Sequence, residues 1–251
     1  MRELAPTLIV NAAAYTAVDK AEEEAELAMT INGIAPGILA EEAKKLGASL
    51  VHYSTDYVFD GKKSTPYTEE DEPNPLNVYG KTKLAGDRAI QDSDIPYLIF
   101  RTSWVYGMRG HNFLKTMLRL FAERDEVRVV DDQVGSPTWC RAIAEITAQV
   151  LACTLYNRND TALKDIAGIY NLTATGKTSW CGFAAAIRDY ASTTNDKLLK
   201  CKVMPITTKE YPTPARRPQN SVLTCDKLKN TIGPDVIGWE RQLELCLDKM
   251  L

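Results

Sequence analysis

The chain has 251 residues, which suits one large domain or two small ones, and its 45% hydrophobic and 25% charged content is typical of a globular protein with a buried core. Its net charge of −3 and pI of about 5.6 argue against a surface for nucleic acid or anionic membranes. The apolar runs are too short to cross a bilayer, and the start of the chain does not resemble a signal peptide. We therefore expect neither a nucleic acid nor a membrane as a partner.

The cysteines are scattered along the chain. Six of them lie 13 to 28 residues apart, without a CxxC pair or a cysteine–histidine cluster: Cys140, Cys153, Cys181, Cys201, Cys225 and Cys246. This spacing predicts neither a disulfide framework nor a zinc site, so no metal is expected. Scattered thiols are typical of a reduced compartment, which predicts a cytoplasmic location.

The first half of the chain alternates apolar runs with helical patterns. Buried strands are predicted over residues 7–10, 49–54 and 97–102. Helices are predicted over residues 19–32, over 36–46 with Gly47 as the stop, and from just after Pro75 toward residue 89. This order predicts an α/β fold, a Rossmann-like doubly wound parallel sheet with helices on both faces.

Tyr79 and Lys83 are four residues apart on the third of these predicted helices. The spacing places both side chains on one helix face, with Cβ atoms about 5–6 Å apart. A lysine ammonium beside a phenol favours the phenolate, so we expect the pKa of Tyr79 to fall below its ordinary value of about 10. Such a tyrosine can exchange a proton near neutral pH. A solvated helix face on which the two residues merely meet explains the same spacing.

Two of the predicted strands end in residues that suit contact with a ligand. Residues 11–14 (NAAA) follow the first strand, and their small side chains allow either close approach of a ligand or plain tight packing. Thr55 and Asp56 lie at the carboxyl end of the second strand, where ligands bind in open α/β sheets. His52, inside that strand, is predicted to be a packed core residue rather than a base.

The second half of the chain is predicted to be mixed α/β. Helices are expected over residues 112–123, 141–155, 226–232 and 240–250, and from an N-cap at Thr178 through residue 190, with strands over residues 127–130, 168–173 and 202–206. We predict that residues 1–175 form a partial dinucleotide-binding domain, of which residues 108–138 contribute to the substrate cleft. Residues 176–251 are predicted to be a smaller substrate-binding region.

Seven segments, in this order, carry a resemblance to a known family: residues 11–22 (NAAAYTAVDKAE), 54–61 (STDYVFDG), 74–83 (NPLNVYGKTK), 101–107 (RTSWVYG), 131–138 (DDQVGSPT), 178–184 (TSWCGFA) and 217–223 (RPQNSVL). Together they resemble the dTDP-4-dehydrorhamnose reductases, which belong to the extended short-chain dehydrogenases/reductases. The resemblance covers nearly the whole chain, and several long motifs in the same order are far more specific than the Tyr79–Lys83 spacing alone.

The resemblance implies an oxidoreductase of nucleotide-sugar metabolism. NADPH or NADH would deliver hydride to the 4-keto carbon of a dTDP-linked 4-keto-6-deoxy sugar, converting dTDP-4-dehydro-L-rhamnose to dTDP-L-rhamnose. The implied catalytic residues are Thr55, Tyr79 and Lys83: Tyr79 donates the proton, Lys83 lowers its pKa and holds the nicotinamide ribose, and Thr55 polarises the carbonyl oxygen. The protein could also form a homodimer, which the sequence does not decide.

Further contacts follow from the same resemblance. The cofactor would be lined by Ala14, Tyr15, Thr16 and Tyr53, together with Tyr79 and Lys83, and the sugar by Thr55, Asp56 and Trp104. Trp104 would serve equally well in hinge packing between the two halves.

The sequence departs from the family at its start. The family opens with a strand and a Gly-rich turn whose amides meet the cofactor pyrophosphate, whereas this sequence contains neither GxxGxxG nor GxGxxG. We therefore expect on the order of 50 residues of the dinucleotide domain to be missing, through a late gene start or a genuine truncation. The choice between NADH and NADPH would lie in that segment, and we expect a chain that lacks its pyrophosphate contacts to bind the dinucleotide poorly.

Two other functions stay open. The regulatory subunit of methionine adenosyltransferase resembles the same family and works by association. The missing Gly-rich turn favours such a role, but retention of Thr55, Tyr79 and Lys83 favours an enzyme. Another sugar-nucleotide epimerase or dehydratase is the third interpretation, although a dehydratase would require an acidic pair near the threonine in place of Asp56 and Tyr57.

Overall fold

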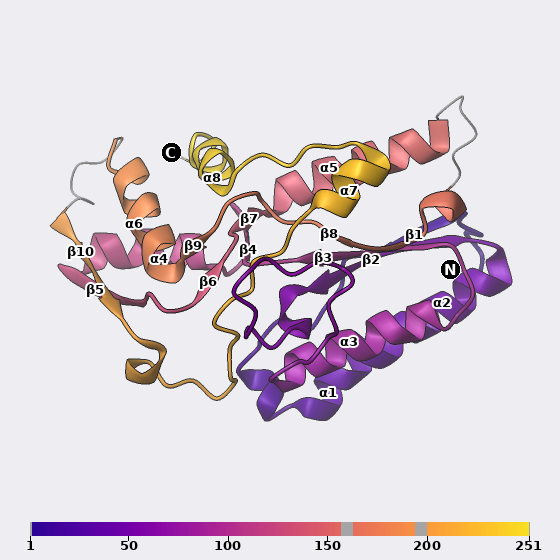
Figure 1. Ribbon diagram of the computed structural model, residues 1–251, viewed down its shortest axis with the longest axis horizontal. Helices are drawn as coiled ribbons and strands as arrows, with labels where there is room; N and C mark the ends of the chain where they lie inside the picture. The colour runs from indigo at the N-terminus through magenta and orange to yellow at the C-terminus, as the bar shows by residue number, and fades with distance from the viewer. Residues whose placement is uncertain (1, 157–162, 194–199, 251) are drawn as a thin grey trace.

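A parallel sheet forms one half of the molecule. The computed structural model describes residues 2–156, 163–193 and 200–250, and Figure 1 shows their arrangement. In this described part the main sheet contains four parallel strands in the order β1 (Leu8–Asn11), β2 (Ser49–Thr55), β3 (Tyr97–Thr102) and β8 (Gly168–Asn171). The predicted parallel α/β sheet is confirmed.

Helices cover both faces of this sheet (Figure 1). One face carries α1 (Ala25–Met29), α2 (Ala35–Leu46) and α3 (Val78–Gln91), and the other carries α5 (Cys140–Tyr156) and α7 (Asp226–Ile232). Successive strand residues point to opposite faces, so Leu50 and Ile99 pack with α2 and α3 while Val51 and Leu98 pack with α5 and α7. Burial on both faces explains why the strands appear as unbroken apolar runs in the sequence.

The first helical segment differs from the prediction of two separate helices. A 3₁₀ turn (Lys20–Glu22) precedes α1, and a π-helical turn (Thr30–Ile34) joins α1 directly to α2. Pro36 has no N–H to bond the carbonyl of Asn32, as a regular helix would require. That carbonyl faces α3 instead, where a Cβ on Gly86 would lie 2.1 Å from it. Gly47 ends α2 with φ of 66°, as the sequence predicts.

A second core lies beside the sheet. Strands β5 (Glu126–Val130) and β10 (Lys202–Ile206) pair in parallel, and α4 (Phe113–Glu123), α6 (Trp180–Ala191) and α8 (Trp239–Leu247) pack with them around buried Leu114, Phe121, Val127, Phe183 and Leu243. The N-cap of α6 is Ser179 rather than Thr178, because the Ser179 hydroxyl accepts the Gly182 N–H at 2.9 Å.

Two short ladders lie where the sheet and the second core meet (Figure 1). They pair β4 (Val105–Tyr106) with β7 (Thr138–Trp139) and β6 (Val134–Gly135) with β9 (Thr178–Ser179). The second core draws on α4 and β5 as well as on α6 and α8, whereas α7 returns to the first sheet. The predicted division at residue 175 stays a prediction. Within the described ranges, no helix is long and apolar enough to span a membrane.

Candidate active site

The first turn of α3 is fixed against the end of β2. The Asn77 side chain caps this helix by accepting the Gly80 N–H at 2.8 Å. Gly80 touches the backbone that follows β2, since a Cβ there would lie only 2.2 Å from the carbonyl oxygen of Tyr57. The close approach places Tyr79 beside Thr55, and the ring of Tyr79 meets that of Tyr57 edge-on with centroids 5.6 Å apart.

A cavity of about 500 Å³ opens at the carboxyl ends of β1, β2 and β3. Eight of the nine predicted site residues line it: Ala14, Thr16, Tyr53, Thr55, Asp56, Tyr79, Lys83 and Trp104. The location agrees with the rule that ligands of open α/β sheets bind outside the carboxyl ends of the strands.

Tyr15 is the predicted residue that the structure does not bring to this cavity. Its hydroxyl donates to the carboxylate of Glu24 at 2.6 Å, and its backbone N–H donates to the Asn32 side chain at 2.8 Å. The tyrosine therefore fastens the loop after β1 to the first helical segment, and its predicted contact with a cofactor receives no support from this placement.

The proton of Tyr79 is held more tightly than the sequence predicts. Burial raises the pKa of Tyr79 to about 12, against the opposing effect of a hydrogen bond with Thr55. The predicted lowering by Lys83 is wrong for this structure, because the Lys83 amine donates to the carbonyl oxygen of Tyr53 at 2.6 Å and lies 3.0 Å from His52 Nε2. Burial also lowers the pKa of Lys83 itself to about 8.

Asp56 is a buried carboxyl group next to the catalytic candidates. Burial raises its pKa to about 6, although hydroxyl donors oppose this shift. Ser103 donates to Asp56 at 3.0 Å, and Thr55 does the same from its own hydroxyl at 3.0 Å. The orientation of the Thr55 hydroxyl therefore depends on Asp56.

Two stacked aromatic rings, Trp104 and Trp180, also line the cavity. Trp104 has a left-handed backbone with φ of 46°, and its ring stacks on Trp180 with centroids 3.6 Å apart. The ring also rests on Gly135, where a Cβ would lie 2.5 Å from Trp104 Cε2. Trp180 is a lining residue that was not predicted from the sequence, although it lies within segment 178–184, one of the segments that carry the family resemblance. Trp104 both packs between the halves and lines the cavity.

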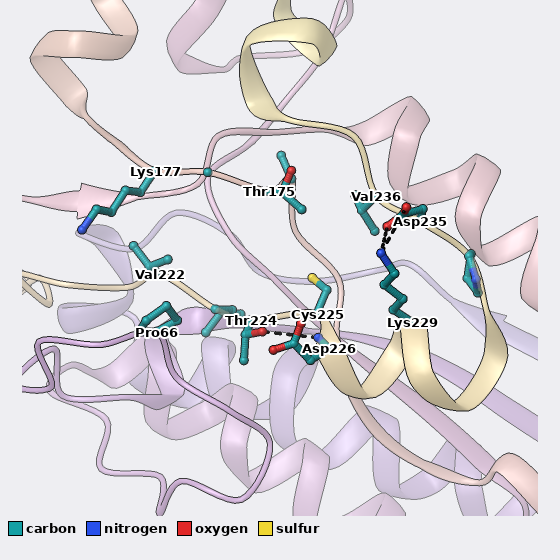
Figure 2. Close-up of a pocket in the computed structure, with 14 residues that line it drawn as sticks. Pro66, Thr175, Lys177, Val222, Thr224, Cys225, Asp226, Lys229, Asp235 and Val236 are labelled. Atoms are coloured by element: carbon teal, nitrogen blue, oxygen red, sulfur yellow. Dashed lines mark hydrogen bonds and ion pairs between the residues drawn. The ribbon is translucent and has the colours of Figure 1, made fainter.

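A second cavity, of about 370 Å³, lies between α7, the loop after β8 and residue 66 (Figure 2). On one side of this cavity the Lys229 amine and the Asp235 carboxylate form an ion pair at 3.0 Å. Lys177 and Asp226 also line it, so the cavity carries two positive and two negative side chains. Its described lining includes none of the nine predicted site residues. Across residues 2–156, 163–193 and 200–250, no group of three or more His, Cys, Asp or Glu side chains could hold a metal ion.

A threonine at the carboxyl end of one parallel strand and a tyrosine and lysine on the next helix, gathered at one cavity, define a short-chain dehydrogenase/reductase. The sequence model described as the RmlD substrate binding domain matches residues 1–251, and the chain belongs to this family.

Individual relatives agree with the family match. A dTDP-4-dehydrorhamnose reductase from Burkholderia thailandensis is 47% identical over 98% of this chain and 83% of its own length. The enzyme of the same name from Escherichia coli K12 is 44% identical over the whole chain and 82% of its own length. The resemblance seen in the sequence is confirmed, and these relatives do not favour the regulatory subunit, the epimerase or the dehydratase.

Solved structures give the same result. A dTDP-4-dehydrorhamnose reductase from Clostridium acetobutylicum superposes with a TM-score of 0.89 at 40% identity, covering 99% of this chain and 82% of that one. The enzyme of that name from Bacillus anthracis, solved in complex with NADP, superposes with a TM-score of 0.89 at 37% identity and with the same coverage.

Proposed function

We propose that this protein reduces dTDP-4-dehydro-L-rhamnose to dTDP-L-rhamnose with NADPH or NADH as the reductant. The observation that carries the proposal is the convergence of Thr55, Tyr79 and Lys83 on one cavity that the stacked rings of Trp104 and Trp180 also line. The names of the most similar relatives supply the substrate class.

The residues present fit the nicotinamide half of a dinucleotide. Ala12, Ala14 and Thr16 line the cavity at the end of β1, and their small side chains leave room for a flat ring near the backbone. Tyr53 lines the adjoining wall, and the buried Lys83 amine is positioned as a donor to a ribose hydroxyl. When bound, the cofactor would supply a hydride.

Tyr79 is suited to act as the general acid. With a pKa raised to about 12, its hydroxyl keeps its proton at neutral pH and can donate it to the oxygen of the reduced carbonyl. Thr55 lies beside that hydroxyl and positions it as its hydrogen-bond partner, while Asp56 holds the Thr55 side chain by accepting its hydroxyl hydrogen. Trp104 and Trp180 stack on each other and both line the cavity, so this aromatic pair would border the bound sugar.

A cytoplasmic location is part of the proposal. It rests on the six cysteines, all of which lie in the described part of the chain and are free. We further propose that the protein forms a homodimer, and light scattering of the purified protein would measure its molecular mass in solution.

The test compares the Tyr79→Phe variant with a Tyr190→Phe variant as its control. Tyr190 lies on α6 with its hydroxyl donating to Asp248, so the control removes a tyrosine hydroxyl outside the cavity. Loss of the general acid should lower kcat by about 10²–10⁴-fold with little change in cofactor affinity. Steady-state kinetics with the dTDP-4-keto sugar provide the measurement, and near-normal turnover of Tyr79→Phe would contradict the assignment.

A further inference from the structure

A chain of buried hydrogen bonds lies behind the catalytic candidates, and the proposed mechanism does not use it. It runs from Asn11 at the end of β1 through His52 on β2 to Lys83 on α3. Asn11 Nδ2 lies 3.0 Å from His52 Nδ1, and Lys83 Nζ lies 3.0 Å from His52 Nε2. All three side chains are buried, so the direction of each hydrogen bond matters energetically.

The direction of the first bond follows from the backbone. The Ala13 N–H donates to Asn11 Oδ1 at 3.2 Å, which fixes the amide with its oxygen toward Ala13 and its NH₂ toward His52. The NH₂ group is a donor only, so His52 Nδ1 must accept. A neutral imidazole that accepts at Nδ1 carries its proton on Nε2. Burial lowers the pKa of His52 to about 2, which keeps the ring neutral.

The second bond then constrains the lysine. His52 Nε2–H points at Lys83 Nζ, and an ammonium group has no lone pair with which to accept it. A neutral amine accepts this hydrogen and still donates one of its own to the carbonyl oxygen of Tyr53 at 2.6 Å. The hydrogen-bond directions therefore match a neutral Lys83.

The charges around the lysine agree with this arrangement. Asp87, one turn further along α3, accepts from Ser54 at 2.6 Å and lies 3.9 Å from Arg101 Nε, so these two buried charges balance. Asp87 Oδ1 is 4.0 Å from His52 Nε2, too far to take its proton. Burial lowers the pKa of Lys83 to about 8, while Asp87 opposes that shift. The neighbouring Tyr79 keeps its proton, and Asp56 is engaged by Ser103 and Thr55.

We propose that His52, held by Asn11 in the tautomer with its proton on Nε2, is a positioning residue that disfavours the ammonium form of Lys83. The catalytic consequence rests on the proposed function. One proton from water is consumed per hydride transferred. A lysine that readily gains and loses a proton can take it up and restore the hydrogen that Tyr79 gives to the sugar oxygen.

The tautomer can be measured without any activity. The chain contains two histidines, His52 and His111, so ¹⁵N-histidine labelling gives one pair of ring-nitrogen signals for each, and His111→Asn assigns the pairs. At about pH 9 we expect a protonated Nε2 and an unprotonated Nδ1 for His52. Both ring-nitrogen signals of His52 should shift as Lys83 titrates near its pKa of about 8, and Lys83→Met should abolish that shift. A proton on Nδ1 at pH 9, which wild-type protein alone can show, would overturn the proposal.

The kinetic test uses His52→Gln and Asn11→Asp. The Gln amide can turn its oxygen toward Lys83, and an Asp at position 11 accepts a hydrogen from His52 Nδ1 and so inverts the tautomer. Either change places a hydrogen-bond acceptor against Lys83, which favours its ammonium form and raises its pKa. The basic limb of the kcat/KM pH profile should therefore move to higher pH by about one unit. Gln242→Met is the control, because Gln242 is equally buried but bonds Trp139 and Ile237 in the second core.

The outcomes separate the two proposals. If His52→Gln loses stability as Gln242→Met does and leaves the basic limb in place, His52 has only a structural role and the inference is wrong. If neither the wild type nor the variants reduce the dTDP sugar, the proposed function fails, while the ¹⁵N spectrum still decides the tautomer.

Discussion

Replacing Gly80 by alanine tests whether the contact between α3 and the end of β2 positions Tyr79. The new Cβ would lie 2.2 Å from the Tyr57 carbonyl oxygen and 3.0 Å from Pro75 Cβ. To reach an ordinary contact, the first turn of α3 must move by about 1.2 Å, because the opposing atom is backbone. Overpacking of this kind costs about 1–3 kcal/mol, and the better helix propensity of alanine returns up to about 1 kcal/mol. We expect a net loss of up to about 2 kcal/mol.

The assay combines thermal unfolding with kinetics. A loss of about 2 kcal/mol in a chain of this size corresponds to a Tm lower by about 4–8 °C. A displacement of about 1 Å at Tyr79 should lower kcat/KM by about 10²-fold. Gly37→Ala in α2 is the matched control, since its Cβ would meet only the methyl group of Ala89 at 3.2 Å. Wild-type Tm and activity in Gly80→Ala would refute the reasoning, because α3 would then not depend on this contact.

Two further predictions concern the walls of the cavity. Gly135→Ala should push the Trp104 ring, whose Cε2 would lie 2.5 Å from the new Cβ, and raise KM for the dTDP sugar by about tenfold with a smaller effect on Tm; an unchanged KM would show that Trp104 does not confine the sugar. Asp56 has its pKa raised by burial from 3.8 to about 6, so its contribution to stability is present below pH 3.8 and is lost as the pH rises through 6. The stability of Asp56→Asn relative to wild type should therefore be up to about 3 kcal/mol more favourable at about pH 8 than at about pH 3, and a urea-unfolding difference independent of pH would contradict this.

The sequence by itself determined the family and most of the long helices and strands. The strands around Leu50 and Leu98 are buried on both faces, so they had to be continuous apolar runs, and such runs are visible without a structure. Local signals were equally direct, as with Gly47 at the end of α2 and the Tyr79–Lys83 spacing on α3. The ordered motifs located the cavity residues because the carboxyl ends of parallel strands meet at one edge.

Only the tertiary structure decided where the side chains point. The spacing of Tyr79 and Lys83 allowed their side chains to meet, but the packing of α3 on β2 directs Lys83 to His52 and the Tyr53 carbonyl. Asn11 and His52 are 41 residues apart in the chain, and only the pairing of β1 with β2 brings them into contact. Burial, which depends on every element packed around a group, reversed the expected pKa shift of Tyr79. These properties arise from contacts distant in sequence, and no local pattern encodes them.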